Sequence, residues 1–142
     1  MTTYFETSAI VKLLIADDGS DRADALWDAA DFLVTSELSF VEARAALAAA
    51  NRGGRLAATS FQHAKGALEE RFRDLHRVQV TEAIVRNAGD LAEEHALRGY
   101  DAVHLSSALA LETAELVLVT WDDDLAKAGR DVGFAVAGTV SA

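Results

Sequence analysis

The sequence predicts an α/β domain with three layers, in which helices flank both faces of a mainly parallel central sheet and a long helical hairpin is added. Two observations predict this class. Short apolar runs rich in β-branched residues alternate with longer segments whose apolar residues have helical spacing. Strands and helices that alternate in this way form parallel sheets. The length of 142 residues and a hydrophobic content of 51% fit one domain, residues 1–142, with its own core.

The first half of the chain is predicted to contain two strands and four helices. In chain order they are a strand that begins at Tyr4 and ends near Glu6, helices over 8–16 and 20–30, a strand over 32–35, and helices over 36–51 and 56–76. We expect Thr7 or Ser8 to cap the first helix, because a hydroxyl can accept a hydrogen bond from a free backbone N–H there. The glycines at 53 and 54 end the alanine-rich helix. The connection between this helix and the next one is short, which predicts that the two helices form an antiparallel hairpin.

The second half repeats the alternation of strands and helices. In chain order we expect a strand over 78–80, a helix from Thr81 to about 97, a helix over 101–112, a strand over 116–120, a helix over 125–128 that follows Asp122, and a strand over 134–137. The run 116–120 has the β-branched enrichment of a buried strand. Because the chain has no proline, the boundaries depend on glycines and polar caps.

Composition excludes several classes of protein. The absence of cysteine removes disulfides, thiol nucleophiles and thiolate metal sites, which leaves carboxylates, imidazoles and hydroxyls for chemistry. No apolar run approaches the roughly 20 residues that a membrane-spanning helix needs. We therefore expect a soluble, cytoplasmic protein with no membrane partner.

The net charge of −10 is unevenly distributed along the chain. Seven of the 13 basic residues, but only three acidic ones, lie between residues 44 and 77, so this segment carries +4 and the remainder −14. A basic segment beside an acidic centre suits a phosphodiester, with Arg44, Arg52 and Arg55 as candidate contacts to nucleic acid or a partner. Solvated helix faces, with pairs such as Glu69 and Arg73, are an equally good interpretation.

Four carboxylates stand where apolar runs end or where helices begin. They are Glu6, Glu42, Asp101 and Asp122. Glu6 and Asp122 follow predicted parallel strands, and ligands of open α/β sheets bind beyond the carboxyl ends of such strands. If the fold gathers the four acids, they need a cation. Mg²⁺ and Mn²⁺ prefer oxygen ligands and can assist hydrolysis of phosphodiesters.

Three of these acids also have a structural interpretation. Asp101 in a first helical turn interacts favourably with the helix dipole, and Asp122 can cap the helix that follows it. Glu42 fits a Ser-x-x-Glu capping box with Ser39, but a helix that starts at Ser36 instead places Glu42 inside it. Glu6 has no obvious partner in a strand that feeds the core. If all four positions were purely structural, four independent coincidences would be needed. A shared site is therefore the favoured interpretation. His104, one helical turn from Asp101, fits a core or supporting histidine better than a metal ligand.

Four segments of the chain resemble the motif blocks of PIN-domain ribonucleases, in particular the VapC toxins of prokaryotic toxin–antitoxin pairs. They are YFETSA (4–9), TSELSFVE (35–42), YDAVHL (100–105) and VTWD (119–122). The resemblance implies a PIN-like domain, an endoribonuclease that depends on Mg²⁺ or alternatively Mn²⁺, a homodimer, and inhibition by a cognate antitoxin. It places Glu6, Glu42, Asp101 and Asp122 on the catalytic and metal-binding positions, and Ser8 and Thr120 on the supporting hydroxyls.

One departure from the family pattern leaves a second function open. The first acid of the family is usually Asp, whereas this chain has Glu6, whose extra methylene displaces the carboxylate. This favours reduced activity or Mn²⁺, and the alternative is a catalytically weak module that binds RNA or a partner. A phosphoryl-accepting α/β domain ranks last, because Lys12, Lys65 and Lys127 are poorly placed to contact an acceptor Asp.

Overall fold

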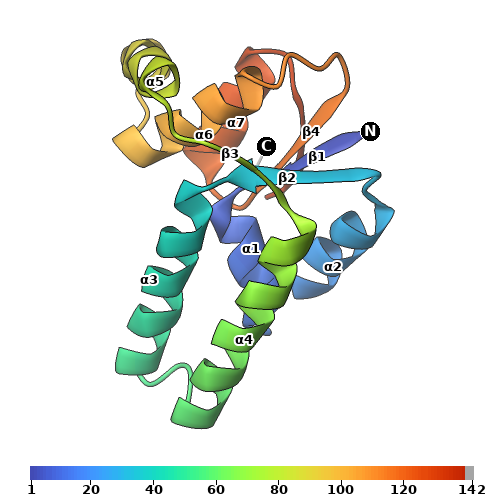
Figure 1. Cartoon of the computed structure of the whole chain (residues 1–142), viewed down its shortest axis with the longest axis vertical. Helices are drawn as coiled ribbons and strands as arrows, with labels where there is room; N and C mark the ends of the chain where they lie inside the picture. Colours follow the sequence, from blue (N-terminus) through green and yellow to red (C-terminus); the bar gives the residue numbers. More distant parts are fainter. Residues whose placement is uncertain (140–142) are drawn as a thin grey trace.

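The computed structural model describes residues 1–139, in which a five-stranded sheet forms the centre of the molecule (Figure 1). The strands are β1 (Thr2–Phe5), β2 (Phe32–Ser36), β3 (His76–Val78), β4 (Leu116–Thr120) and β5 (Ala135–Gly138). Their order is β3-β2-β1-β4-β5, and every neighbouring pair is parallel. The α/β class with a parallel sheet is therefore confirmed. The last three residues of the predicted domain lie outside the described residues.

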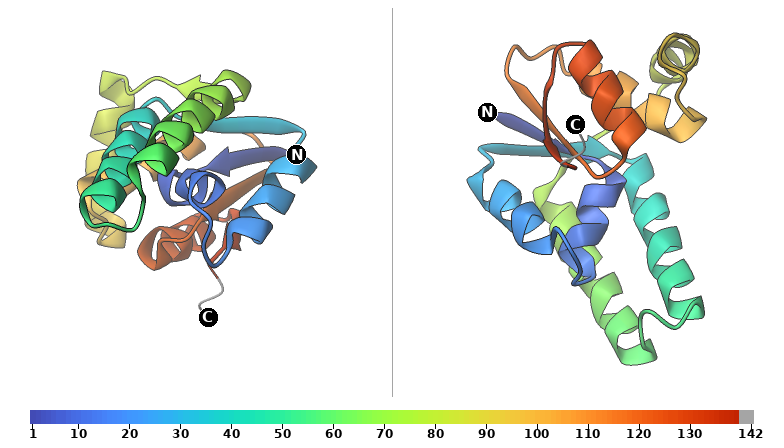
Figure 2. Two further views of the ribbon diagram at one scale, coloured as in Figure 1. Left: turned by 90° about the horizontal axis from the view of Figure 1, so that it is seen from below. Right: turned by 180° about the vertical axis from the view of Figure 1, so that it is seen from behind.

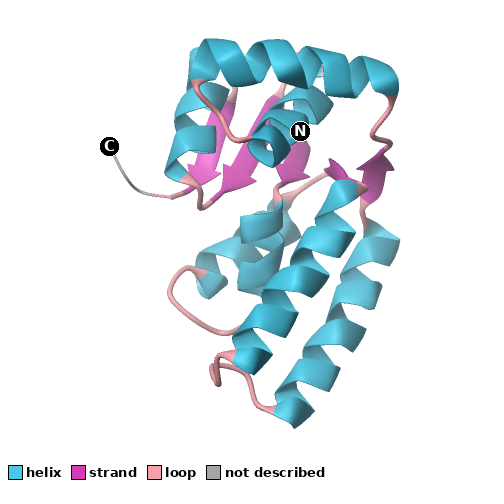
Figure 3. Cartoon of the chain, turned by 90° about the vertical axis from the view of Figure 1, so that its left-hand side faces the viewer, coloured by secondary structure: helices cyan, strands magenta, loops and turns pink. Residues whose placement is uncertain are grey.

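Helices cover both faces of this sheet. They are α1 (Thr7–Leu14), α2 (Ser20–Ala29), α3 (Leu38–Arg52), α4 (Ala58–Asp74), α5 (Glu82–His95), α6 (Gly99–Leu109) and α7 (Asp123–Asp131). Helices α5, α6 and α7 lie on one side of the sheet, and α1 and α2 lie on the other (Figure 3). Helices α3 and α4 form the predicted hairpin, which projects from the body of the molecule (Figure 2). Among residues 1–139, no helix is long and apolar enough to cross a membrane.

The alternation of side chains along the strands divides the core in two. Tyr4 of β1 and Leu118 of β4 belong to the buried cluster under α5, α6 and α7. The next residue on each strand, Phe5 or Val119, faces the opposite way and packs with residues of α1, α2, α3 and α4. A third, separate cluster joins the two helices of the hairpin through Leu47, Ala50, Leu56 and Ala64. Both faces of the central strands are thus buried, as their continuous apolar runs predict.

The register of β1 and β4 brings their carboxyl ends level. Phe5 is paired with Val119, and the backbone N–H of Glu6 donates to the Val119 carbonyl at 3.1 Å. Gly138 ends β5 beside them with a φ of +115°, where a Cβ atom would lie 2.2 Å from the Thr120 carbonyl oxygen. Glycine is required here because any side chain would clash with the end of β4. This close packing fixes the edge of the sheet at which the acidic residues meet.

Three predicted boundaries are corrected. Strand β3 spans 76–78 rather than 78–80, because pairing with residues 34–36 of β2 selects this polar segment at the sheet edge. Helix α4 spans 58–74 rather than 56–76, since Leu56 instead fills the hairpin core and its N–H donates to the Ala50 carbonyl. Helix α6 begins at Gly99 rather than at residue 101, so Asp101 lies within the first turn.

Candidate active site

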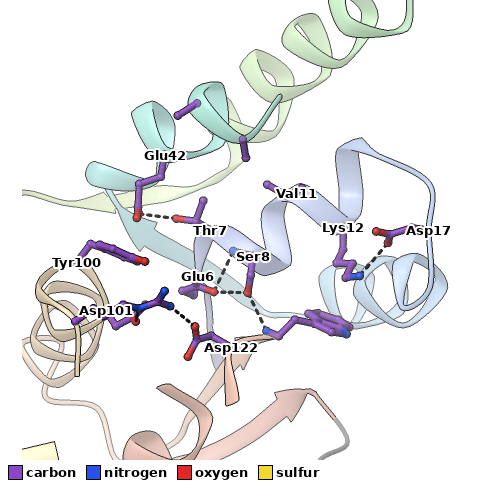
Figure 4. A pocket seen from close by; sticks show the side chains of 14 residues that line it. Glu6, Thr7, Ser8, Val11, Lys12, Asp17, Glu42, Tyr100, Asp101 and Asp122 are labelled. Carbon is purple, nitrogen blue, oxygen red and sulfur yellow. Dashed lines mark hydrogen bonds and ion pairs between the residues drawn. The ribbon is translucent and has the colours of Figure 1, made fainter. Parts of the chain in front are cut away.

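All four predicted acids line one cleft of about 550 Å³ at the carboxyl ends of β1 and β4 (Figure 4). Each comes from a different element: Glu6 follows β1, Glu42 lies in α3, Asp101 in α6 and Asp122 between β4 and α7. The parallel arrangement of the strands places the two strand exits side by side, and helices α3 and α6 bring the other two acids to the same edge. The structure therefore gathers residues that are far apart in the sequence.

Glu6 has a set of hydrogen-bond partners that the sequence did not reveal. Its Oε2 atom accepts from the backbone N–H and the hydroxyl of Ser8, at 3.0 and 2.5 Å, and from the Thr120 hydroxyl at 2.9 Å. Glu6 is thus itself the N-cap of α1, and the prediction of Thr7 or Ser8 as the cap is wrong. The expectation that Glu6 lacks structural partners is wrong as well. Because these donors are neutral, they fix the carboxylate without cancelling its charge.

Ser8 and Thr120 link the ends of β1 and β4. The Ser8 hydroxyl accepts from the backbone N–H of Trp121 at 2.8 Å, and the Thr120 hydroxyl accepts from that of Asp122 at 3.0 Å. Each hydroxyl also donates to Glu6, so each one both donates and accepts a hydrogen bond. These bonds orient the turn that carries Asp122 relative to Glu6.

Glu42 points into the cleft from inside α3 and caps no helix. The helix begins at Leu38, and its first turn has no side-chain cap. Ser39, which the capping box would require, is buried and bonded to the Thr35 hydroxyl at 2.7 Å. The capping-box interpretation of Glu42 is therefore wrong.

A chain of buried and partly buried hydrogen bonds holds Glu42 in place. Its Oε1 atom accepts from the Thr7 hydroxyl at 2.7 Å and lies 2.6 Å from His104 Nε2, while His104 Nδ1 lies 2.9 Å from the Tyr4 hydroxyl. Burial raises the pKa of Glu42, but the His104 bond and charge and the Thr7 bond outweigh it and hold the pKa below its usual value. His104 is fully buried, contacts Glu42 and does not line the cleft.

Asp101 and Asp122 share one basic side chain, Arg98. Arg98 Nε donates to Asp101 Oδ2 at 3.1 Å, and Arg98 Nη2 donates to Asp122 Oδ2 at 2.7 Å. The second oxygen of Asp122 accepts from the backbone N–H of Leu125, so the predicted cap of α7 is present. Arg98 was not among the predicted site residues. Its position one helical turn before Asp101 is the sequence signal that could have identified it.

The pKa of Asp101 is raised to about 6. Burial is the main cause, and the negative charge of Asp122 adds to it. The hydrogen bond and charge of Arg98 oppose this rise without reversing it. Arg98 therefore does not fully offset the burial of Asp101 and the charge of Asp122, and a further cation beside Asp101 would also favour its ionised form.

The basic residues predicted to contact nucleic acid or a partner lie elsewhere. Arg44, Arg52 and Arg55 are exposed, and none lines the acidic cleft. Arg52 ends α3 at the far end of the hairpin, and Arg55 follows it in the connection to α4. A role for these side chains would need a ligand that extends along the hairpin.

Fold and site together define a class of protein, and comparison with known proteins gives its family. The chain matches the PIN domain over residues 3–131 and belongs to that family. It is 43% identical over 134 residues to Ribonuclease VapC45 of Mycobacterium tuberculosis (strain CDC 1551 / Oshkosh), which covers 94% of this chain and 93% of the relative. This similarity places the chain among the VapC ribonucleases of the family.

Solved structures have the same fold. VapC20 of Mycobacterium tuberculosis, described as a toxin that cleaves the sarcin–ricin loop, superposes with a TM-score of 0.67 at 20% identity, covering 89% of this chain and 95% of that one. A toxin–antitoxin complex from Klebsiella pneumoniae contains a chain with a TM-score of 0.64 at 18% identity, covering 87% and 90%. The PIN-like architecture predicted from the sequence is thereby confirmed.

PIN-domain ribonucleases generally use a divalent metal, and the donors in the cleft suit one. All four candidate ligands are carboxylates, which hard divalent cations prefer. Within residues 1–139, no three acidic or histidine side chains converge closely enough to hold a metal ion together. Asp101 and Asp122 are the pair already brought together, through Arg98.

Proposed function

We propose that this chain is a Mg²⁺-dependent endoribonuclease that acts as the toxin of a toxin–antitoxin system. The observation that carries the proposal is the meeting of four carboxylates from four elements in one cleft, at the carboxyl edge of a parallel PIN-domain sheet. The similarity to a VapC ribonuclease over nearly the whole chain supports RNA as the substrate. The nature of the donors supports Mg²⁺, with Mn²⁺ as the alternative ion.

Each acid has a distinct part in this proposal. Asp101 and Asp122 would hold the metal, and Glu6, fixed by Ser8 and Thr120, would add its negative charge to the site. The ion would supply a positive charge for the phosphate and lower the pKa of water. Glu42 stays ionised at neutral pH, because its pKa is held low, and can accept a hydrogen bond that orients the attacking water.

The proposal includes partners and location. Similarity to VapC ribonucleases and to the fold of a toxin from a toxin–antitoxin complex supports a cognate antitoxin as the physiological inhibitor. A homodimer and a cytoplasmic location are the corresponding assembly and compartment. The antitoxin can be tested by co-purification with the neighbouring gene product, the homodimer by sedimentation of the isolated chain, and the location by cell fractionation.

One observation favours a second candidate function, a catalytically weak module that binds RNA or a partner. The first acid is Glu6, and its Oε2 atom is already bonded to three neutral donors. A carboxylate committed to the α1 cap has less freedom to approach a metal. Turnover that depends on metal separates the two functions, because a binding module would retain RNA without cleaving it.

The test is single-turnover cleavage of total cellular RNA and labelled oligoribonucleotides. We expect cleavage in Mg²⁺ that EDTA abolishes, and a loss of at least about 100-fold, or roughly 2.7 kcal/mol of transition-state stabilisation, when Asp122→Asn is introduced. Asp131→Asn is the matched control, because Asp131 is paired with Lys127 on the same helix and does not line the cleft. Cleavage that persists in EDTA or in Asp122→Asn would contradict the proposal.

A further inference from the structure

Arg98 places a permanent positive charge in the acidic cleft. From the residue that precedes α6, its guanidinium contacts the Oδ2 atoms of two carboxylates that come from different elements. The guanidinium carbon also lies 4.9 Å from the ring centroid of Tyr100, in a cation–π contact. The planar fork of arginine suits this geometry, because two of its N–H groups can reach two acceptors at once.

The other basic residue that lines the cleft faces a different acid. Lys12 Nζ donates to Asp17 Oδ1 at 3.0 Å and to the Asp18 carbonyl at 2.7 Å. Its charge is directed at the loop after α1, away from Asp101 and Asp122. Arg98 is therefore the basic residue of the cleft that neutralises this pair.

A divalent metal at Asp101 and Asp122 would meet Arg98 at the same oxygens. Two cations beside one pair of carboxylates repel each other, and each guanidinium bond occupies an oxygen that a metal could ligate. Arg98 can yield its place. Its side chain is 59% exposed, and Tyr100 beside it is 44% exposed, so the path of the guanidinium toward solvent is open.

We propose that Arg98 is a resident counter-ion that holds Asp101 and Asp122 together in the metal-free protein and that a divalent metal must displace. This inference rests on the metal site of the proposed function. Arg98 is thus a positioning residue that also lowers the affinity of the cleft for metal. It stabilises the metal-free cleft and raises the metal concentration that is needed to fill it.

The experiment is calorimetric titration of the purified full chain with Mn²⁺. We expect Arg98→Gln to bind Mn²⁺ at least about threefold more tightly than the parent, because the competing charge is gone. Arg98→Lys keeps the charge but lacks the planar fork, so its Mn²⁺ affinity should fall between those of the parent and of Arg98→Gln. Arg86→Gln, which removes the same charge from a side chain that is 77% exposed on α5, should have no effect and controls for net charge.

A second measurement concerns the metal-free protein. In EDTA, Arg98→Gln should lower the melting temperature, and the same substitution should lower it less when Asp101→Asn is already present, because the repulsion that Arg98 screens has been removed.

The outcomes separate this inference from the proposed function. A parent that binds Mn²⁺ while Arg98→Gln binds it equally or more weakly would overturn the competition and leave the metal site standing. An unchanged metal-free melting temperature in Arg98→Gln would overturn the counter-ion role. A parent that binds no Mn²⁺ would refute the metal site itself, and the competition with it.

Discussion

Replacing Asp101 with Asn should stabilise the metal-free protein and abolish its response to metal. Asp101 is ionised at neutral pH, although its side chain is only 2% exposed and its pKa is raised to about 6 from the ordinary value of 3.8. A carboxyl group whose pKa is higher in the folded than in the unfolded chain binds its proton more tightly when folded. Its ionisation therefore costs stability, and the cost grows as the pH rises from about 4 to 6 and is constant above.

The size of this effect follows from the two pKa values. At 1.36 kcal/mol per pKa unit, the cost at pH 7.5 is about 3 kcal/mol, and at pH 4.5 it is about 1 kcal/mol. The opposing effect of Arg98 is already contained in the value for Asp101. Because Asn has the same shape and no charge, Asp101→Asn should gain most of this amount, about 2–3 kcal/mol at pH 7.5.

Urea denaturation followed by circular dichroism in EDTA measures the effect directly. The free energy of unfolding should be higher for Asp101→Asn than for the parent at pH 7.5, and the difference should shrink by about 2 kcal/mol at pH 4.5. Mn²⁺ at about 100 times its dissociation constant should stabilise the parent by about 2.7 kcal/mol and should leave the variant nearly unchanged.

A matched control is Asp131→Asn, because Asp131 is exposed and its pKa is lowered by the bond to Lys127. That substitution should bring no gain at either pH. The reasoning would be refuted if Asp101→Asn did not raise the free energy of unfolding, or if it raised it equally at pH 4.5 and pH 7.5. A parent that melts at the same temperature with and without millimolar Mg²⁺ or Mn²⁺ would argue against the metal site.

Two further predictions concern Glu6 and the hairpin. Glu6→Gln keeps an oxygen that can accept the bonds from Ser8 and Thr120, so its melting temperature should stay near the parent's, whereas single-turnover RNA cleavage should fall at least about tenfold, or roughly 1.4 kcal/mol. Cleavage at the parent rate would remove Glu6 from the site. Arg52→Gln and Arg55→Gln together should weaken RNA binding and flatten its dependence on salt, with Mn²⁺ affinity unchanged. If the two substitutions left RNA affinity unchanged, these arginines would belong to ordinary solvated helix faces.

The order of strands and helices was predictable because each buried strand leaves a local signal. The run 116–120, for example, is apolar and buried along its length, and it forms β4 as predicted. Strand β3 was misplaced because His76 and Arg77 are exposed at the sheet edge and carry no apolar pattern. There the partner strand, rather than local preference, selects the paired residues.

The four acids could be predicted, but their partners could not. Strand exits and helix starts are visible in the sequence, and the parallel topology brings them together. The bond between Arg98 and Asp122 joins residues 24 positions apart, and the bond between Tyr4 and His104 joins residues 100 positions apart. Such contacts depend on how α6 packs on the sheet. No local pattern shows the long-range bonds of Arg98 and Thr7 to Asp122 and Glu42; only the spacing between Arg98 and Asp101, one helical turn, could have pointed to Arg98.

The pairing of β1 with β4 also has a consequence for the time at which the site can first exist. Glu6 and Thr120, which are bonded in the finished cleft, are separated by 114 residues. At synthesis rates of 5–20 residues per second, roughly 6–23 s pass between the making of β1 and that of β4. During this interval the nascent chain has Glu6 and Glu42 but no edge of β4 to complete the cleft. A ribonuclease of this topology therefore has no complete cleft until β4 and Asp122 have been made, at residue 122 of 142.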